Sequence, residues 1–200
     1  MAGAISLATT SSKNNLQKTK RPSMPSFMRA DASRLCDNVV ENNPLIIMGD
    51  SPAKLAQYAG ALERLPSAHV MGINRGTAGV CLPELWATMH CDADRLNHRY
   101  KSHLPPLAAG AYVIGYECNG DEHECVDLVV SADHIWGTSA LLGVLAGLWL
   151  GYDEVVLAGV ELSGYYGAPS KLASWQAWAP YMQGRVKTMG GALEGIIDKA

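Results

Sequence analysis

The sequence predicts an α/β protein with a Rossmann-like open, mostly parallel sheet and helices on both faces. Short, wholly apolar runs recur along the chain and end at a glycine or a polar residue, as strands buried on both faces do. Segments with helical spacing of apolar residues alternate with these runs, which favours βαβ units. The 200 residues are 48% hydrophobic, enough for a substantial core.

The first βαβ unit is expected over Leu45 to Asn74. Leu45 to Met48 is apolar and stops at a glycine, so a buried strand is predicted there. Ser51 and Pro52 are placed as the N-cap and first residue of a helix over Ala53 to Leu65. His69 to Asn74 is the second strand, which makes a parallel pair the leading interpretation.

The rest of the domain continues this alternation. Strands are expected at 85–90, 111–116, 127–131, 154–160 and 185–188, and helices at 92–101, 138–150, 172–183 and 192–197. The helix from Thr138 to Leu150 is apolar nearly all round, which predicts burial on more than one side. Gly143 and Gly147 would let its backbone approach the sheet closely.

Residues 1–43 are predicted to be a flexible basic tail, and residues 44–200 the single Rossmann-like domain. The first thirty residues contain no acid and five cations, which are Lys13, Lys18, Lys20, Arg21 and Arg29. The stretch lacks apolar periodicity, as mobile termini do. A role for this tail in docking onto an acidic surface stays open.

Composition excludes several classes of protein. A net charge of -3 argues against a protein that grips nucleic acid through phosphates. No secretory signal is recognisable, and the longest apolar run, Ile135 to Leu150, is shorter than the ~20 residues of a membrane span. An odd set of five cysteines favours free thiols and a cytoplasmic location.

The predicted strands end in polar residues, and such ends converge at one edge of a parallel sheet. Candidate ligand-binding residues on this rim are Gly49, Asp50, Ser51, Asn74 and Glu161. For Asn74, ligand binding and a simple turn are equally compatible with the sequence.

Gly137, Thr138 and Ser139 form a loop of small residues at the start of the apolar helix. Free backbone N–H groups and the positive end of the helix dipole suit an anion such as a phosphate. This loop is the strongest candidate for binding a nucleotide.

His90 and His134 are the candidate catalytic residues, because an imidazole exchanges protons near neutral pH. Either could instead be a structural histidine. No metal site is predicted, since the chain has neither a CxxC pair nor an HExxH motif. Trp175 and Trp178 are expected to pack in the core, with stacking on a ligand as the alternative.

Three blocks of sequence resemble the bacterial sialyltransferase-like superfamily, which includes motility-accessory-factor glycosyltransferases. The blocks are Ile46 to Pro52, Gly72 to Arg75, and Gly137 to Ser139 with Leu150 to Glu161. The chain also resembles short members of this group found in phages and prophages.

The resemblance implies a Rossmann-like domain acting as a nucleotide-sugar-dependent glycosyltransferase or related transferase. Gly49, Asp50, Asn74, Thr138 and Ser139 would line the nucleotide pocket, with Glu161 where the family often has Asp. The nucleotide sugar would be the substrate, with no further cofactor implied.

The sialyltransferases carry a base histidine after the last strand, whereas this chain has no histidine after His134. A non-catalytic nucleotide-binding module, or a phage structural or host-interaction protein on the same fold, is therefore the alternative. Homo-oligomerisation stays open.

Overall fold

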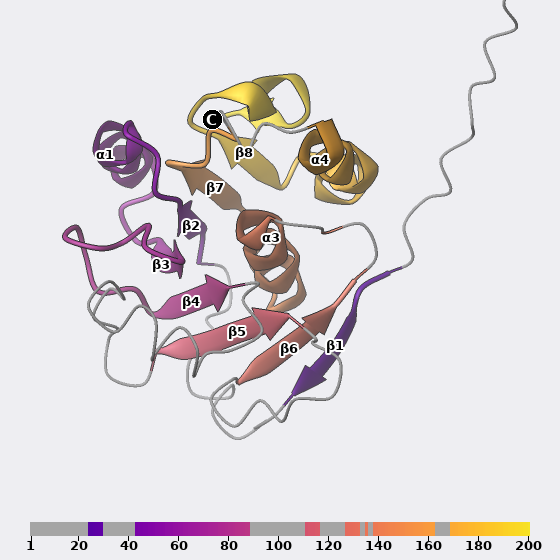
Figure 1. The fold of residues 1–200 in the computed structure, drawn as a ribbon. Coiled ribbons are helices and arrows are strands. Elements are labelled where there is room, and N and C mark those ends of the chain that lie inside the picture. The colour runs from indigo at the N-terminus through magenta and orange to yellow at the C-terminus, as the bar shows by residue number, and fades with distance from the viewer. Residues whose placement is uncertain are drawn as a thin grey trace, which may run out of the picture.

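A mostly parallel, nine-stranded sheet organises the described part of the chain, with helices on both of its faces (Figure 1). The computed structural model describes residues 24–29, 43–88, 111–116, 127–132, 135, 138–162 and 169–200. The predicted fold class, an open α/β sheet of the Rossmann-like kind, is confirmed.

The strands and helices follow one another in an alternating order. They are β1 (Ser26–Arg29), β2 (Leu45–Met48), α1 (Lys54–Arg64), β3 (His69–Ile73), β4 (Leu85–Thr88), β5 (Tyr112–Tyr116), β6 (Leu128–Ser131), α3 (Ser139–Trp149), β7 (Val155–Ala158), α4 (Pro169–Met182), β8 (Val186–Thr188), the 3-10 helix η3 (Ala192–Gly195) and β9 (Asp198–Lys199).

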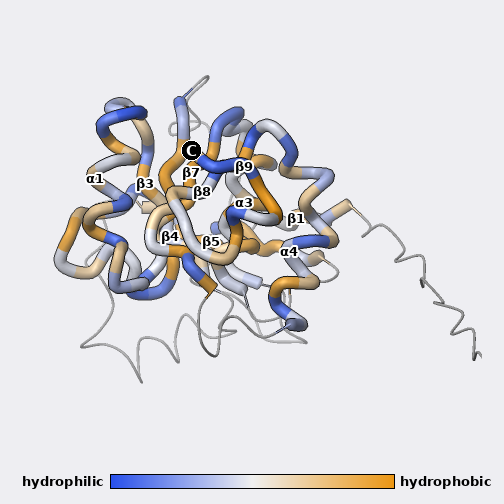
Figure 2. The backbone as a smooth tube through the Cα atoms, turned by 90° about the horizontal axis from the view of Figure 1, so that it is seen from above, coloured by the Kyte–Doolittle hydropathy of each residue, from blue (hydrophilic) through white to orange (hydrophobic). Residues whose placement is uncertain are grey.

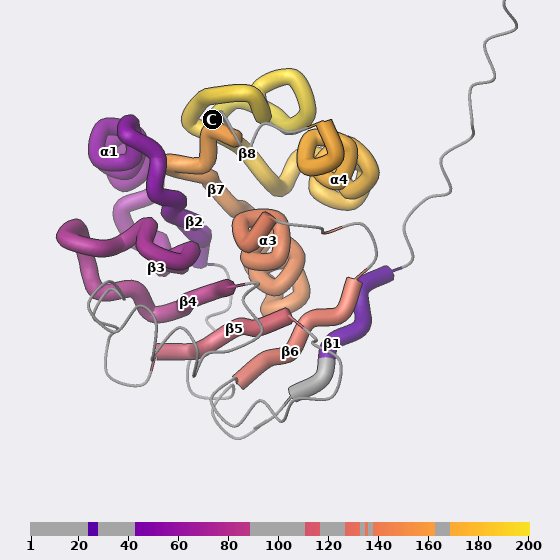
Figure 3. Tube along the Cα trace, viewed as in Figure 1, coloured from indigo at the N-terminus to yellow at the C-terminus, as the bar shows by residue number. Residues whose placement is uncertain are grey.

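The spatial order of the strands is β1-β6-β5-β4-β3-β2-β7-β8-β9. Strand β2 lies inside the sheet, where Leu45 pairs in parallel with His69 of β3 on one side and Val155 of β7 on the other. Among the described strands, only β1 runs antiparallel, against β6. Strands β1 and β9 therefore form opposite edges of the sheet (Figure 3).

Residues of β2 alternate between two apolar layers, as the two-residue period of a strand requires. Leu45 and Ile47 pack into the layer beneath α3 and α4, whereas Ile46 and Met48 pack into the layer beneath α1. Helix α1 thus covers one face and α3 and α4 cover the other (Figure 1). Both faces of the central strands are buried, which explains their unbroken apolar sequences.

Helix α3 packs unusually close to the sheet because two of its residues have no side chain. A Cβ atom at Gly143 would lie 2.8 Å from Cδ1 of Ile73, and one at Gly147 would lie 2.7 Å from Cδ2 of Leu45. The close approach predicted from these two glycines is confirmed. The helix runs from the carboxyl end of β3 down to the amino end of β2.

Most of the predicted elements lie within a few residues of the observed ones, and the structure differs from the predictions in three places. The N-cap of α1 is Ala53, so Ser51 and Pro52 precede the helix instead of opening it. Ser26–Arg29, inside the predicted tail, forms strand β1. The predicted last helix is the short 3-10 helix η3, which is followed by edge strand β9. The predicted helix at 92–101 lies outside the described residues.

Hydrophobic residues concentrate in the central segments of the fold, while β9 at the edge is hydrophilic (Figure 2). Trp175 and Trp178 of α4 are fully buried in the core, as expected. Among the described helices, none combines the length and apolar character that crossing a bilayer requires.

Candidate functional site

The strand order places a topological switch point between β2 and β7. The chain leaves β2 through α1 on one face to reach β3, and leaves β7 through α4 on the other face to reach β8. The loops that follow β2 and β7 therefore diverge to opposite faces at the carboxyl edge. In open α/β sheets, ligands bind at this point.

The two diverging loops touch through their backbones. The N–H of Gly49 donates to the carbonyl of Ala158 at 2.8 Å, and that of Ser51 donates to Gly159 at 3.1 Å. A Cβ atom at Gly49 would collide with the carbonyl oxygen of Gly159. Only glycine fits here, so the floor of the edge between β2 and β7 is bare backbone.

The turn after β3 folds back onto the end of β2. Asn74 has a left-handed backbone, with φ of 51°, and its Oδ1 accepts a hydrogen bond from Thr88 at 3.0 Å. Its carbonyl accepts from Nε1 of Trp86 at 2.9 Å. A Cβ atom at Gly76 would collide with the carbonyl of Met48. The Asn74 side chain thus holds the turn, while its Nδ2 group has no acceptor within the part of the chain that the structure describes.

Helix α1 holds the acidic side chains of both loops. Nζ of Lys54 pairs with Oδ1 of Asp50 at 2.7 Å. Oε1 of Gln57 accepts from the N–H of Gly159 at 2.7 Å, and its Nε2 donates to Oε1 of Glu161 at 3.4 Å. Side chains from the first turn of α1 therefore bind both the loop after β2 and the loop after β7.

The start of α3 lies at the same edge, over the ends of β3 and β4. Gly143 packs against Ile73 and Ala87 near the ends of these strands. Thr138 precedes Gly143 by five residues, which is about 7 to 8 Å along a helix. This places the first turn of α3 beyond the carboxyl ends of the strands.

The first turn of α3 carries hydrogen-bonding groups without partners. Thr138 is the N-cap residue but makes no side-chain cap, and its Oγ1 has no partner although the residue is only 4% exposed. In the described structure, the N–H groups of Ala140 and Leu141 also have no acceptor. No acidic side chain occupies this turn.

Unpartnered buried groups gather at this edge of the sheet. The described residues contain four buried side-chain polar atoms without a partner, and three of them follow β2, follow β3 or begin α3. These are Oγ of Ser51, Oγ1 of Thr77 and Oγ1 of Thr138; the fourth is Nε1 of Trp175 in α4. Buried polar groups are nearly always paired, so these three atoms set this edge apart within the described chain. They do not form one cluster, because Thr77 packs against Gly72 on the α1 side of the sheet and Thr138 begins α3 on the other side.

The described candidate residues all lie at this edge. Gly49, Asp50 and Ser51 follow β2, Asn74 follows β3, Glu161 follows β7, and Thr138 and Ser139 begin α3. Gly137 and both candidate catalytic histidines, His90 and His134, lie outside the described residues.

Sequence reasoning missed Lys54 and Gln57, and it placed Arg75 at a strand end without giving it a role. Lys54 follows Asp50 by four residues, and that spacing was a readable signal for an ion pair. Arg75 is exposed at the tip of the turn after β3 and makes no ion pair with any described residue. Gln57 meets Glu161 from 104 residues away, for which a single sequence offers no signal.

At the opposite, amino edge of the sheet, the described polar side chains beside β2 and β3 are hydrogen-bonded. Nδ1 of His69 is hydrogen-bonded to the hydroxyl of Tyr152 at 2.7 Å, and its Nε2 lies 3.3 Å from Nδ2 of Asn43. Oε2 of Glu84 accepts from the N–H of Val70 at 2.8 Å. Burial, with a smaller contribution from Glu84, raises the pKa of Tyr152 to about 12. Its hydroxyl therefore stays protonated and bonded.

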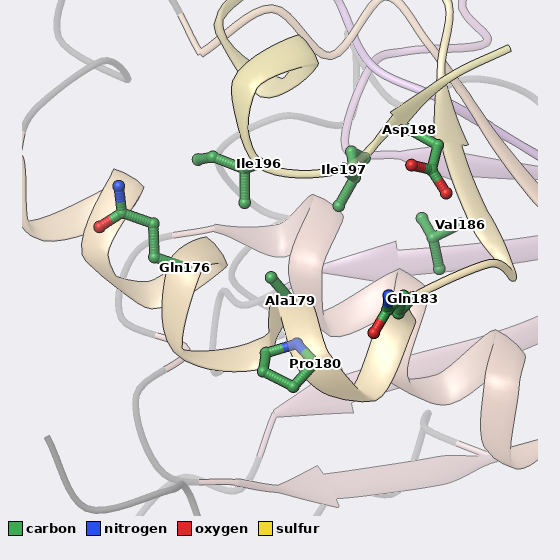
Figure 4. A pocket seen from close by; sticks show the side chains of 8 residues that line it. All are labelled: Gln176, Ala179, Pro180, Gln183, Val186, Ile196, Ile197 and Asp198. Atoms are coloured by element: carbon green, nitrogen blue, oxygen red, sulfur yellow. The ribbon is translucent and has the colours of Figure 1, made fainter.

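A cavity of about 370 Å³ lies between α4 and the β8–β9 edge (Figure 4). Its lining residues are Gln176, Ala179, Pro180, Gln183, Val186, Ile196, Ile197 and Asp198. Asp198 is the only ionisable one among them, and Val186 marks the amino end of β8. The cavity is therefore far from the switch point and lacks a cation for a phosphate.

Comparison with protein-family models, with curated proteins and with solved structures found no match for this chain. Within the part of the chain that the structure describes, no three histidine, cysteine, aspartate or glutamate side chains gather as metal ligands would. A function for the carboxyl edge therefore has to be argued from its own residues.

Proposed function

We propose that this protein binds a nucleotide at the carboxyl edge of its sheet and acts as a nucleotide-sugar-dependent, sialyltransferase-like transferase. One observation carries the proposal. The start of α3 offers a buried hydroxyl, Oγ1 of Thr138, and two buried N–H groups, of Ala140 and Leu141, that have no partner among the described residues. These donors lie beyond the carboxyl ends of β3 and β4, at the same edge of the sheet as the switch point between β2 and β7.

The arrangement suits a phosphate. Backbone N–H groups at a helix start carry positive partial charge, which favours an anion. Because Ala140 and Leu141 are buried, a bound phosphate would be screened little by water. No carboxylate competes for these donors within the first turn of α3.

Cations and acceptors at the same edge fit the remaining parts of a nucleotide. Arg75, at the turn beside Asn74, supplies a guanidinium that no described carboxylate pairs with, and it suits a second phosphate group. Asp50 and Glu161 are hydrogen-bond acceptors and suit sugar hydroxyls. Lys54 balances the charge of Asp50, which reduces its repulsion of a phosphate.

A nucleotide-binding module without catalysis is the second candidate. The two carboxylates at this edge, of Asp50 and Glu161, are both engaged, by Lys54 and Gln57. Carboxylate oxygens that already accept hydrogen bonds offer fewer free lone pairs to a reacting hydroxyl, which supports binding without turnover.

The test is thermal stabilisation by UDP, CMP, GDP, ADP and their sugar conjugates. A nucleotide present at about 100 times its Kd should raise the free energy of unfolding by roughly 2.7 kcal/mol. Ser139→Asp should weaken that binding about a hundredfold, because it places a negative charge beside the phosphate. Ser170→Asp, at the start of α4, is the matched control and should bind normally.

The outcomes separate the candidates. Stabilisation together with cleavage of a nucleotide sugar supports the transferase, and binding without cleavage supports the module. Cleavage that survives both His90→Ala and His134→Ala would remove the histidines as acid–base residues. No stabilisation by any of these compounds, or equal losses in Ser139→Asp and Ser170→Asp, would refute nucleotide binding at the start of α3.

A further inference from the structure

Gln57 connects α1 to the loop after β7 through both ends of its amide. Its Oε1 accepts from the N–H of Gly159 at 2.7 Å, and its Nε2 donates to Oε1 of Glu161 at 3.4 Å. Gly159 has φ of 70°, so the backbone turns sharply between the two contacts. One side chain therefore fixes both the path of the loop and the carboxylate that it carries.

Glu161 is held from its other side by the turn after β8. The N–H of Ala192 donates to the carbonyl of Glu161 at 3.3 Å. A Cβ atom at Gly191 would lie 2.9 Å from Cα and 3.1 Å from Cγ of Glu161. The residue thus lies between α1 and this glycine turn, and Gln57 supplies the described hydrogen bond to its carboxylate.

We propose that Gln57 is a positioning residue that presents the carboxylate of Glu161 to a sugar hydroxyl of the bound nucleotide. The inference rests on the proposed function, since it assumes that the nucleotide lies at the switch point. A carboxylate only accepts hydrogen bonds, so its free oxygen suits a hydroxyl and not a phosphate. An amide is needed at position 57 because the two contacts require one acceptor and one donor.

The charged groups around this contact are few. Lys54 packs against Gly159 and is paired with Asp50, and Glu194 approaches the neighbouring Gly190 while paired with Lys199. Both cations are thus already engaged by other carboxylates. The neutral amide of Gln57 therefore directs Glu161 without cancelling its charge.

Two substitutions separate positioning from simple packing. In Gln57→Glu, the new carboxylate still accepts from the N–H of Gly159 but cannot donate to Glu161. In Gln57→Leu, both contacts are lost. We expect the thermal midpoint to fall more in Gln57→Leu, whereas at about pH 8 both variants bind UDP, CMP, GDP or ADP about tenfold more weakly than the parent.

The pH dependence of binding is the decisive readout. Two carboxylates in contact bind one shared proton at a higher pH than a lone carboxylate does. That proton replaces the amide hydrogen, so Gln57→Glu should regain affinity as the pH falls from about 8 to about 5. Gln57→Leu should not regain it, and Gln176→Glu on the exposed side of α4 should match the parent throughout.

Normal affinity of Gln57→Glu at about pH 8, or the absence of its recovery at low pH, would overturn the role of Gln57. If the parent binds none of the four nucleotides, the proposed function fails. The contact between Gln57 and Glu161 is then tested in the protein without a nucleotide. There, the side-chain amide NMR signals of Gln57 should shift in Glu161→Gln. Unchanged signals would overturn the positioning role independently of any nucleotide.

Discussion

The two ends of the same central strands are built in opposite ways. At the amino edge, His69, Tyr152 and Asn43 satisfy one another across β2, β3 and β7. At the carboxyl edge, hydroxyls of Ser51 and Thr138 are buried without a partner. A protein gains stability from the first arrangement and loses some to the second. The contrast shows that the described groups at the amino edge stabilise the fold, and it is what the proposed ligand site at the carboxyl edge rests on.

Of the substitutions considered, Gly76→Ala is expected to lower the free energy of unfolding most, because it distorts the backbone at the carboxyl edge. Its Cβ atom would collide with the backbone carbonyl of Met48, which cannot move without distorting β2. We expect the free energy of unfolding to fall by about 3 kcal/mol in a denaturant titration. Gly195→Ala is the control, because nothing surrounds that position, and it should change stability by less than about 0.5 kcal/mol. Equal effects of the two substitutions would show that the turn after β3 does not pack on β2.

High pH should lower the free energy of unfolding through the ionisation of Tyr152 at the amino edge. The pKa of Tyr152 is about 12 in the folded protein, raised mainly by burial, against about 10 in the unfolded chain. Below about pH 10 both states keep the proton, so the contribution to stability is complete. Between about pH 10 and about pH 12 only the unfolded chain ionises, so the free energy of unfolding should fall, by about 2 kcal/mol in all.

The measurement is the difference in unfolding free energy between the parent and Tyr152→Phe as a function of pH. That difference favours the parent below about pH 10 and should fall and reverse in sign by about pH 12, because the variant has no hydroxyl to ionise there. Burial and contact with Cys81 raise the pKa of Tyr58 in the same direction, so its contribution is present in both proteins and cancels. A difference that stays constant to about pH 12 would contradict the inferred state of Tyr152.

Near neutral pH, two conservative substitutions should act with opposite signs. Tyr152→Phe leaves His69 without its partner and should lower the free energy of unfolding by about 1 kcal/mol. Thr138→Val removes a buried hydroxyl that has no partner and should raise it by about 1 kcal/mol. Thr138→Val should at the same time weaken nucleotide binding. Destabilisation by Thr138→Val would mean that its hydroxyl is satisfied in solution, and the contrast between the edges would then be wrong.

The candidate site was predictable only in part. That Gly49, Asp50 and Asn74 lie at one edge of the sheet could be predicted, because parallel strands end at a common edge. Whether Asn74 stabilises a turn or binds a ligand could not be predicted. It depends on Thr88 and Trp86 of the next strand, which bond to Asn74 in the folded chain.

The sequence by itself determined strands β2 to β8, helices α1, α3 and α4, and the close approach of α3 to the sheet. Apolar runs, helical spacing and the glycines at 143 and 147 are local patterns whose physical consequences need no knowledge of distant residues. It did not determine β1, because a four-residue strand at the sheet edge has only one neighbour and a weak pattern of its own.

Only the tertiary structure decided that the switch point lies between β2 and β7, and which residues make contacts beside it. The order of strands depends on the side to which each crossover turns, and Gln57 reaches Glu161 across 104 residues of chain. Whether Thr138 stays without a partner likewise depends on every group packed around it. Local sequence fixes which groups are polar, but the packing of the whole domain decides which of them are left to bind something else.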